Sequence, residues 1–350
     1  MLLPLLRRAS KAGRILAAIS VLVVAIESHS NEPGGLDSLQ STIQSVYLEH
    51  ANAVVRVKVA TEKLGEASEP KVELLVFTGF FISDKGQVLT TYMPPKETTR
   101  VWIEQNGISY LADIIGADAR TNIALLQVIN LPKSFDFIEL IADKEPQSIG
   151  SFAFAVTSPL DFNPTPKFGL VTGFESHFAE FEFPLAYTRL SIPLGPAEGG
   201  SPAFDAQNEL IGIIMATLPE VNSSYIIPTK ALARIANQLS EHQKVRYGVI
   251  PIAFEEKADS YNLTKRVLIK SIVPGSPAER SGLRPKDQLI SLDDSPAKSL
   301  NEVRNSIFFK SPGDFILFKV KRDDKELEFA ILLEPQEDHT LPSTEEESSP

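Results

Sequence analysis

The sequence contains no cysteine. This absence excludes disulfide bonds, thiolate metal ligands and a cysteine nucleophile. Basic residues are also scarce beside acidic ones, with 34 Lys and Arg against 45 Asp and Glu, a net charge of −11. Such a balance argues against nucleic acid or an anionic membrane as the main partner. Motifs of phosphate-binding loops, zinc peptidases and dinucleotide-binding folds are missing as well, so the sequence predicts no cofactor and no metal.

The first 30 residues have the pattern of an export signal. Basic residues precede the apolar run "ILAAISVLVVAI" (15–26), and small residues follow near Ser28 and Ser30. This order is typical of a secretory signal peptide. The run is shorter than the roughly 20 apolar residues of a membrane span. We therefore expect an exported protein of the periplasm or cell envelope, with residues 1–30 either cleaved or kept as an N-terminal anchor.

Most of the chain after residue 50 predicts β-structure. Short β-branched and aromatic runs alternate with Gly, Pro and Asp turns, a pattern that favours an all-β sandwich or barrel. Amphipathic patterns predict helices over 36–50 and 229–243. The predicted strands are 53–60, 72–83, 87–93, 100–104, 123–129, 150–157, 169–176, 185–192 and 209–217.

A second, smaller unit follows from about residue 246 to 335. Its strands are expected at 247–254, 266–273, 288–294, 314–321 and 326–333, with helical turns at 276–282 and 299–310. The tail from 336 to 350 is acidic and nearly free of apolar residues, a composition that predicts disorder.

Four motifs resemble the HtrA/Deg group of trypsin-like serine proteases. These are "TGFFISDKGQVLT" (78–90), "ADIIGADARTNIALLQV" (112–128), "IGSFAFAVTSP" (149–159) and "GLVTG" (169–173). The resemblance implies a mostly β fold: a trypsin-like double β-barrel over 36–245 and a C-terminal PDZ domain over 246–335. It also implies relatives that cleave proteins and often form trimers.

The three catalytic positions of that group hold other residues here. Its chemistry needs a serine hydroxyl, an imidazole base and a carboxylate that orients the imidazole. In register with the motifs, the histidine position holds Met93 and the aspartate position holds Asn122. Counting back from "ELIGI" (209–213), the serine position holds Gly199 in "GPAEGGSPAF" (195–204). The sequence therefore predicts a degenerate member, a pseudoprotease.

A rearranged site is the alternative reading. Ser201 lies two residues beyond the nucleophile position, and His177 is the one histidine in a loop of the barrel region. A Ser201–His177 pair with Glu175 or Glu198 would supply nucleophile, base and carboxylate. Gly-Ser-Pro is, however, an ordinary turn sequence.

The small unit resembles a PDZ domain of the HtrA type. Its motifs are "IVPGSPAERSGLRPKDQLISLDD" (272–294) and "SPGDFILFKVKRDDKE" (311–326). By this resemblance the loop Arg246-Tyr247-Gly248-Val249 would hold the terminal carboxylate of a peptide, and the next strand would pair with that peptide. Pro251 stands on that expected strand without an N–H, which predicts weakened or altered pairing.

The groove of this domain has a further candidate wall and an alternative role. Leu300, Val303 and Ile307 share one helical face, which fits either the groove or the core. The sequence is compatible with two roles for the PDZ domain: peptide binding, or packing and oligomer contacts alone.

Three functions follow from these patterns. The first is an exported, non-proteolytic polypeptide-binding scaffold or chaperone-like module that binds polypeptide C-termini or unfolded segments. For this function the resemblance also implies a homo-oligomer, a trimer. The second is a serine endopeptidase that uses Ser201. The third is an envelope-assembly subunit in which neither domain binds free peptide.

Overall fold

The computed structural model describes residues 35–64, 70–91, 99–142, 147–178, 181–258 and 265–336. The predicted signal or anchor, Met93 and the acidic tail beyond Gln336 lie outside these ranges.

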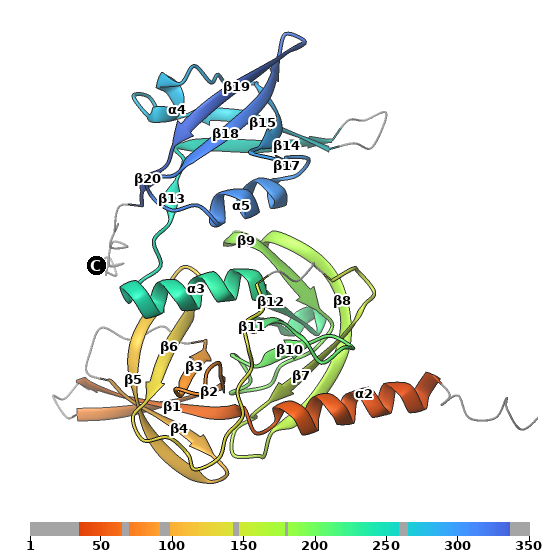
Figure 1. Ribbon diagram of the computed structural model, residues 1–350, viewed down its shortest axis with the longest axis vertical. Coiled ribbons are helices and arrows are strands. Elements are labelled where there is room, and N and C mark those ends of the chain that lie inside the picture. Colours follow the sequence, from red (N-terminus) through yellow and green to blue (C-terminus); the bar gives the residue numbers. More distant parts are fainter. Residues whose placement is uncertain are drawn as a thin grey trace, which may run out of the picture. The chain divides into compact units, whose positions relative to one another are not determined.

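Six antiparallel strands form a first closed barrel in the order β1-β2-β3-β6-β5-β4. Figure 1 shows it in red to yellow, and its interior holds branched apolar side chains such as Val57, Ile103 and Leu126. Its strands are β1 (Val54–Leu64), β2 (Pro70–Phe81), β3 (Gln87–Thr90), β4 (Thr99–Gln105), β5 (Ile108–Asp118) and β6 (Ile123–Val128).

A second closed barrel follows in the order β10-β11-β12-β9-β8-β7. Small residues such as Ala153, Ala155 and Ala203 share its core with Leu190 and Ile214. Its strands are β7 (Phe152–Thr157), β8 (Thr165–Phe178), β9 (Phe181–Leu190), β10 (Pro202–Phe204), β11 (Leu210–Leu218) and β12 (Ser223–Pro228), with a 3-10 turn η1 (Pro219–Val221) before the last.

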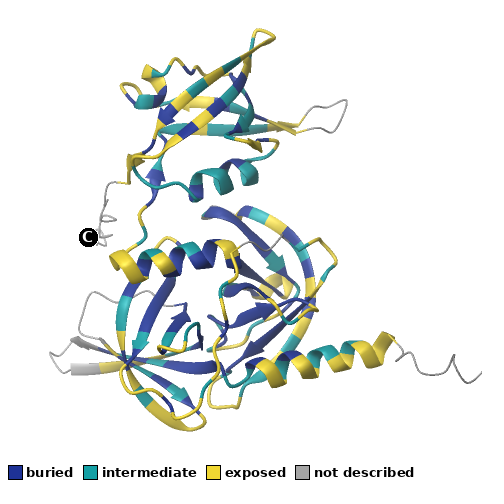
Figure 2. Ribbon diagram, viewed as in Figure 1, coloured by how far each residue is buried: buried dark blue, intermediate teal, exposed yellow. Residues whose placement is uncertain are grey.

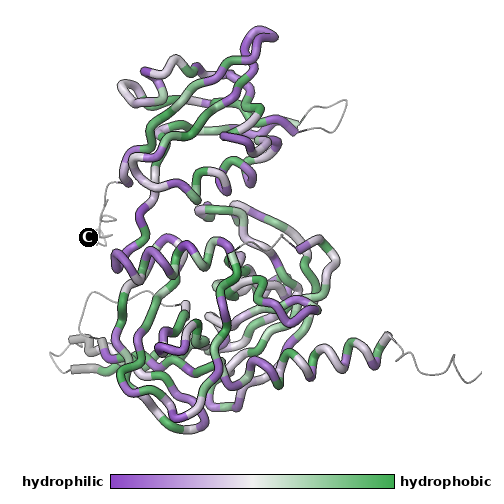
Figure 3. Tube along the Cα trace, in the orientation of Figure 1, coloured by the Kyte–Doolittle hydropathy of each residue, from purple (hydrophilic) through white to green (hydrophobic). Residues whose placement is uncertain are grey.

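One helix precedes the barrel strands in the chain and one follows them. Helix α2 (Gly35–His50) precedes β1, and the imidazole of its last residue, His50, stacks on the Phe204 ring at 4.0 Å. Helix α3 (Thr229–His242) packs against β5 and β6 of the first barrel and β11 and β12 of the second. Figures 2 and 3 show the buried, apolar stripe of α3 against the barrels and its polar face outside. None of the helices in the described ranges is long and apolar enough to cross a membrane.

The C-terminal domain is built on a sheet in the order β14-β15-β16-β18-β19, with β17 beside β16. A separate two-stranded ribbon joins β13 to β20. The strands are β13 (Gly248–Val249), β14 (Ile252–Ala258), β15 (Lys265–Ile272), β16 (Gln288–Leu292), β17 (Ser295–Pro296), β18 (Phe315–Arg322), β19 (Lys325–Leu332) and β20 (Glu334–Pro335). The helices are α4 (Pro277–Arg280) and α5 (Leu300–Phe308).

The structure confirms the mostly β fold, a double barrel followed by a smaller sheet domain. The single strand expected over 247–254 is wrong. It is divided into β13 and β14, and Pro251 lies between them, because proline has no N–H for a ladder. The N–H of Ile252 then bonds the carbonyl of Ile250 at 2.8 Å. Pro251 therefore removes no ladder bond from β14.

Capping explains where α5 begins. Ser299 and Glu302 form a reciprocal capping box, in which the hydroxyl accepts from the Glu302 N–H and the carboxylate accepts from the Ser299 N–H. One face of α5 turns inward: Val303 is 1% exposed, while Leu300 and Ile307 pack partly buried against the same core.

Candidate functional site

The glycine-rich segment 195–201 lies where the two barrels meet. The carbonyl of Gly199 accepts from the N–H of Thr78 on β2, at 2.9 Å. The N–H of Gly200 donates to the carbonyl of Ile214 on β11, at 2.8 Å. The segment is thus bonded to both barrels, at the place where the resemblance puts the active site.

Gly199, at the expected nucleophile position, is partly exposed, and a side chain there would require one neighbouring side chain to shift slightly. A Cβ built there would meet one atom closely, the hydroxyl oxygen of Thr91 at 3.0 Å. Its neighbour Gly200 differs: φ is +92°, and a Cβ would lie 2.0 Å from the Thr78 carbonyl oxygen. The fold therefore demands glycine at 200 but not at 199.

Glu198, beside the nucleophile position, is buried with a full set of partners. Its side chain is 3% exposed, and its carboxylate lies 2.5 Å from the ammonium of Lys167 on β8. The Thr157 hydroxyl donates to the same carboxylate at 2.8 Å, and the N–H of Gly195 donates as well. Buried polar and charged groups are costly unless they are paired and hydrogen-bonded. Glu198 therefore anchors the segment to β7 and β8.

Ser201 lies in the protein interior. It is 0% exposed, its hydroxyl donates to the Glu198 carbonyl at 2.7 Å, and its own carbonyl accepts from the Ile214 N–H. His177 lies near the end of β8, opposite Glu182 of β9, and is exposed. No hydrogen bond joins the described side chains of Ser201 and His177. The structure does not bring this pair together.

The alternative carboxylates also have other partners. Glu175 accepts from the Arg189 guanidinium at 3.1 Å. Burial raises the pKa of the Glu256 carboxyl on β14, but hydrogen bonds from Lys265 and the Leu300 N–H, together with the Lys265 charge, lower it overall.

Asn122, at the expected aspartate position, occupies a left-handed turn between β5 and β6. Its φ is +56°, a conformation that asparagine and aspartate tolerate better than most residues. The turn is fixed by Asp118, whose carboxylate accepts from the N–H and the hydroxyl of Thr121. The third position, Met93, lies outside the described residues.

Family comparisons agree with this layout. A trypsin-like peptidase domain model matches residues 77–213, and a PDZ domain model matches residues 248–333. The solved HtrA-type protease AlgW with a tripeptide superposes with a TM-score of 0.67 over 84% of this chain and 97% of its own, at 20% identity. The chain has the HtrA architecture.

Curated relatives are periplasmic proteases. A probable periplasmic DegP-like serine endoprotease of Chlamydia muridarum is 26% identical over 268 residues, which are 73% of this chain and 53% of the relative. The periplasmic pH-dependent serine endoprotease DegQ of Escherichia coli is 27% identical over 263 residues, 72% of this chain and 57% of DegQ. The chain thus spans about half the length of these relatives.

Within the HtrA architecture, the loop 246–249 of the PDZ domain is held by the barrels. Tyr247 is 5% exposed, and its hydroxyl donates to the Asp118 carboxylate at 2.7 Å. The guanidinium of Arg120 lies 4.7 Å from the centre of the Tyr247 ring. Burial first, and then the Asp118 charge, raise the pKa of Tyr247 far above its ordinary value. Its phenol therefore stays protonated and serves as a donor.

Backbone groups of the same loop already have partners. The Gly248 N–H donates to the Lys310 carbonyl at 3.3 Å, and the Arg246 carbonyl accepts from the Arg234 guanidinium at 3.2 Å. Val249 pairs with Glu334 in the β13–β20 ribbon. The Arg246 side chain is exposed. The loop contributes its backbone to the fold, and its role in peptide binding stays a prediction.

The PDZ sheet ends at β14, which has β15 as its single neighbour in the sheet. Helix α5 lies beside it: the Leu300 N–H donates to the Glu256 carboxylate of β14 at 3.1 Å. Ile252 and Phe254 on β14 and Leu300 and Ile307 on α5 are only partly buried. Edge strand and helix are the two walls that a strand-adding peptide would require.

Sequence reasoning missed the buried Lys167–Glu198 pair and the Asp118–Tyr247 bond. Lys167 and Glu198 are 31 residues apart, and Asp118 and Tyr247 are 129 apart. Neither pair belongs to a motif with fixed spacing. The one available signal was Glu198 itself, an acidic residue inside a glycine-rich turn.

Proposed function

We propose that this chain is an exported polypeptide-binding protein that does not cleave peptide bonds. The observation that carries the proposal is the state of the segment 195–201. The position expected to hold the nucleophile is the partly exposed Gly199, while the nearest serine hydroxyl, that of Ser201, is buried and donates to a backbone carbonyl. A serine that attacks a peptide carbonyl must reach the substrate and transfer its proton to a base.

The other two positions support the same proposal. A thioether, as at Met93, accepts no proton near neutral pH, and the amide of Asn122 carries no charge to stabilise an imidazolium. Three substitutions in one catalytic set leave a trypsin-like fold without its chemistry. Binding of polypeptide is the part of the family function that the loss does not affect.

Location and ligand follow from the relatives and from the first 30 residues. The relatives are named periplasmic, and a basic stretch followed by 15–26 is an export pattern, so we place this chain in the periplasm or cell envelope. The related AlgW structures hold a tripeptide or a decapeptide. We propose polypeptide C-termini or unfolded segments as ligands of the PDZ domain here.

Self-association is also part of the proposal. Three apolar side chains point outward from β7 and β8 of the second barrel: Phe152 is 45% exposed, Phe168 50% and Leu170 39%. Phe152 and Leu170 face each other across the β7–β8 ladder. Phe168 precedes Leu170 by two residues and therefore lies on the same face of β8. A contiguous apolar patch of this kind favours contact with a second copy.

Replacing Phe168 by aspartate is therefore expected to shift the full chain from an oligomer to a monomer in sedimentation or light-scattering measurements. Phe315→Asp, which alters an exposed aromatic side chain on β18, is the matched control. An unchanged mass for Phe168→Asp, or a monomeric parent, would contradict this surface.

Labelling with a fluorophosphonate tests the loss of catalysis. The full chain is expected to stay unlabelled, because Gly199 has no hydroxyl and that of Ser201 is buried. An active trypsin-like protease labelled in the same tube verifies the reagent. Labelling of the parent that disappears in Ser201→Ala would support the alternative, a serine endopeptidase with a rearranged site.

A library of peptides with free C-termini tests the binding part. The full chain is expected to retain a subset of them. Retention of none, together with no binding to a chemically unfolded protein, would favour the third reading, an envelope-assembly subunit that binds no free peptide.

A further inference from the structure

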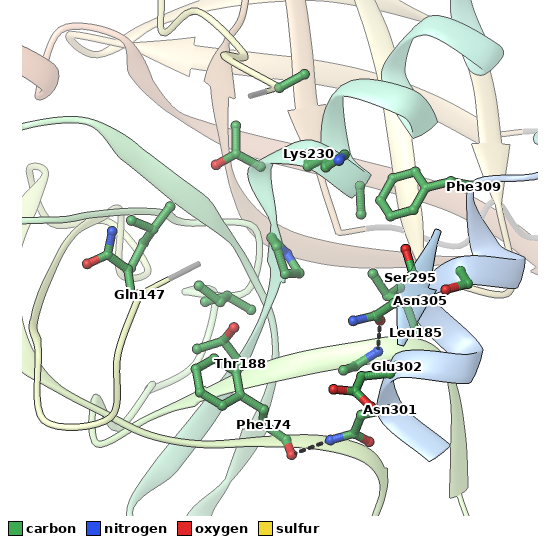
Figure 4. A pocket seen from close by; sticks show the side chains of 18 residues that line it. Gln147, Phe174, Leu185, Thr188, Lys230, Ser295, Asn301, Glu302, Asn305 and Phe309 are labelled. Atoms are coloured by element: carbon green, nitrogen blue, oxygen red, sulfur yellow. Dashed lines mark hydrogen bonds between the residues drawn. The ribbon is translucent and has the colours of Figure 1, made fainter. Parts of the chain in front are cut away.

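A large cavity opens beneath helix α5, away from the segment 195–201. Its volume is about 910 Å³, within the roughly 300–1,000 Å³ of most ligand sites. Strands β9, β11 and β12 of the second barrel, the start of α3 and helix α5 enclose it (Figure 4). The mouths of β-barrels are common places for such sites.

The floor of the cavity is apolar. Phe174, Leu185, Ile211, Ile226 and Phe309 line it. These side chains come from both barrel strands and the end of the PDZ helix, so a hydrophobic group that enters is removed from water on several sides. Burial of such a group contributes about 25 cal/mol for each Å² of apolar surface.

Helix α5 closes the cavity by bonding backbone groups that the barrel leaves unpaired. The β8–β9 ladder is interrupted between Glu182 and Tyr187. Within that gap the Asn305 carboxamide oxygen accepts from the Ala186 N–H at 2.8 Å. The Arg304 guanidinium donates to the Phe183 carbonyl at 2.9 Å. These bonds hold the α5 wall of the cavity against the strand.

Two donors on the wall keep unused capacity. The carboxamide oxygen of Asn305 accepts the hydrogen bond from Ala186. Its carboxamide nitrogen faces the cavity and has no hydrogen bond to the described residues (Figure 4). The ammonium of Lys230 lies 5.3 Å from the centre of the Phe309 ring and forms no ion pair within the described ranges. The acidic residue at the rim, Glu302, accepts instead from the N–H groups of Lys298 and Ser299.

An apolar floor beneath a cation and an amide donor is complementary to a hydrophobic group that carries a carboxylate. We propose that this cavity binds the C-terminal end of an apolar polypeptide segment, with the last side chain on the floor and the carboxylate at Lys230 and Asn305. The proposal rests on the proposed function and names a second place where it acts. Amide and hydroxyl side chains of Gln147 and Thr188 continue the lining, which suits the backbone of a peptide better than the plain chain of a fatty acid.

Calorimetric titration of the full chain tests this site. The probes are an acetylated hexapeptide of leucine and alanine ending in phenylalanine, the same peptide with a C-terminal amide, and decanoate. The free-acid peptide is expected to bind at least tenfold more tightly than its amide, because a charge-assisted hydrogen bond is lost in the amide. Decanoate is expected to bind more weakly than the peptide. Tighter, Lys230-dependent binding of decanoate would overturn the choice of a polypeptide.

Variants locate the binding. Lys230 is exposed, and Lys230→Glu is expected to weaken binding of the free-acid peptide at least tenfold. Ser306→Trp fills the cavity from α5 and is expected to abolish binding of this peptide. Lys270→Glu, at an exposed position on β15, is the control for a charge change and is expected to have no effect.

Leu300→Lys alters the PDZ groove instead of the cavity. If this variant loses binding while Lys230→Glu and Ser306→Trp bind fully, the peptide lies in the groove. That result would overturn the cavity site and leave the proposed function intact. If the parent binds neither this peptide nor unfolded protein, the proposed function fails as well.

Discussion

Replacing Glu198 by alanine is expected to lower the free energy of unfolding by about 2–3 kcal/mol, because the buried carboxylate accepts hydrogen bonds from the Lys167 ammonium and from neighbouring donors. The loss of its bonds to Thr157 and Gly195 frees the segment 195–201 as well. Urea denaturation measures the change. Glu182→Ala is the control, since its ion pair with Arg304 is 74% exposed on the glutamate side and contributes within about 1 kcal/mol.

A double variant separates the pair from the rest. Glu198→Ala combined with Lys167→Met should cost clearly less than the two single losses added together, because the buried Glu198 carboxylate is then not left without its cation and Lys167 is not left without its carboxylate. Additive losses, or a Glu198→Ala protein as stable as its parent, would mean that this carboxylate does not anchor the segment.

Gly200→Ala is expected to be the more damaging of two neighbouring substitutions, with a loss of at least about 3 kcal/mol. Alanine at φ +92° is strained, and its Cβ would lie 2.0 Å from the Thr78 carbonyl oxygen. Gly199→Ser is the matched variant and is expected to change stability by no more than about 1 kcal/mol, since a Cβ there meets the Thr91 hydroxyl at 3.0 Å. Thermal unfolding followed by circular dichroism compares both with the parent.

The comparison also bears on the proposed loss of catalysis. If Gly199→Ser is tolerated, the fold accepts a side chain at the expected nucleophile position. The missing serine is then a change of sequence alone, without a collapse of the surrounding structure. An equally severe loss of stability in Gly199→Ser and Gly200→Ala would contradict the prediction that position 199 tolerates a side chain.

The barrels were predictable because their evidence is local. Runs such as 123–129 are apolar and bounded by turn residues, and β6 occupies Ile123–Val128. Strands β5, β10 and β12 were missed: β5 has a mixed polar and apolar sequence, β10 has three residues, and β12 follows a 3-10 turn with no break in the apolar pattern. The strand expected to run through Pro251 instead begins after it, at Ile252, and the effect of Pro251 on peptide pairing stays a prediction.

The candidate site was predictable only as a register of positions. Motif spacing assigned Gly199 to the nucleophile position, and the structure places this residue where the two barrels meet. Burial of Ser201 was beyond that register, because it depends on bonds to Glu198 and Ile214. The contacts of α5 with Ala186 and of Tyr247 with Asp118 join segments more than 100 residues apart, and no pattern within either segment signals them.

The most direct test of the central claim is hydrolysis of casein and of an unfolded protein by the purified full chain, beside its Ser201→Ala variant. We predict no turnover by either protein, because the hydroxyl of Ser201 is buried, position 199 holds glycine and position 93 holds methionine instead of an imidazole. Turnover by the parent that is lost in Ser201→Ala would contradict the account and make Ser201 the nucleophile.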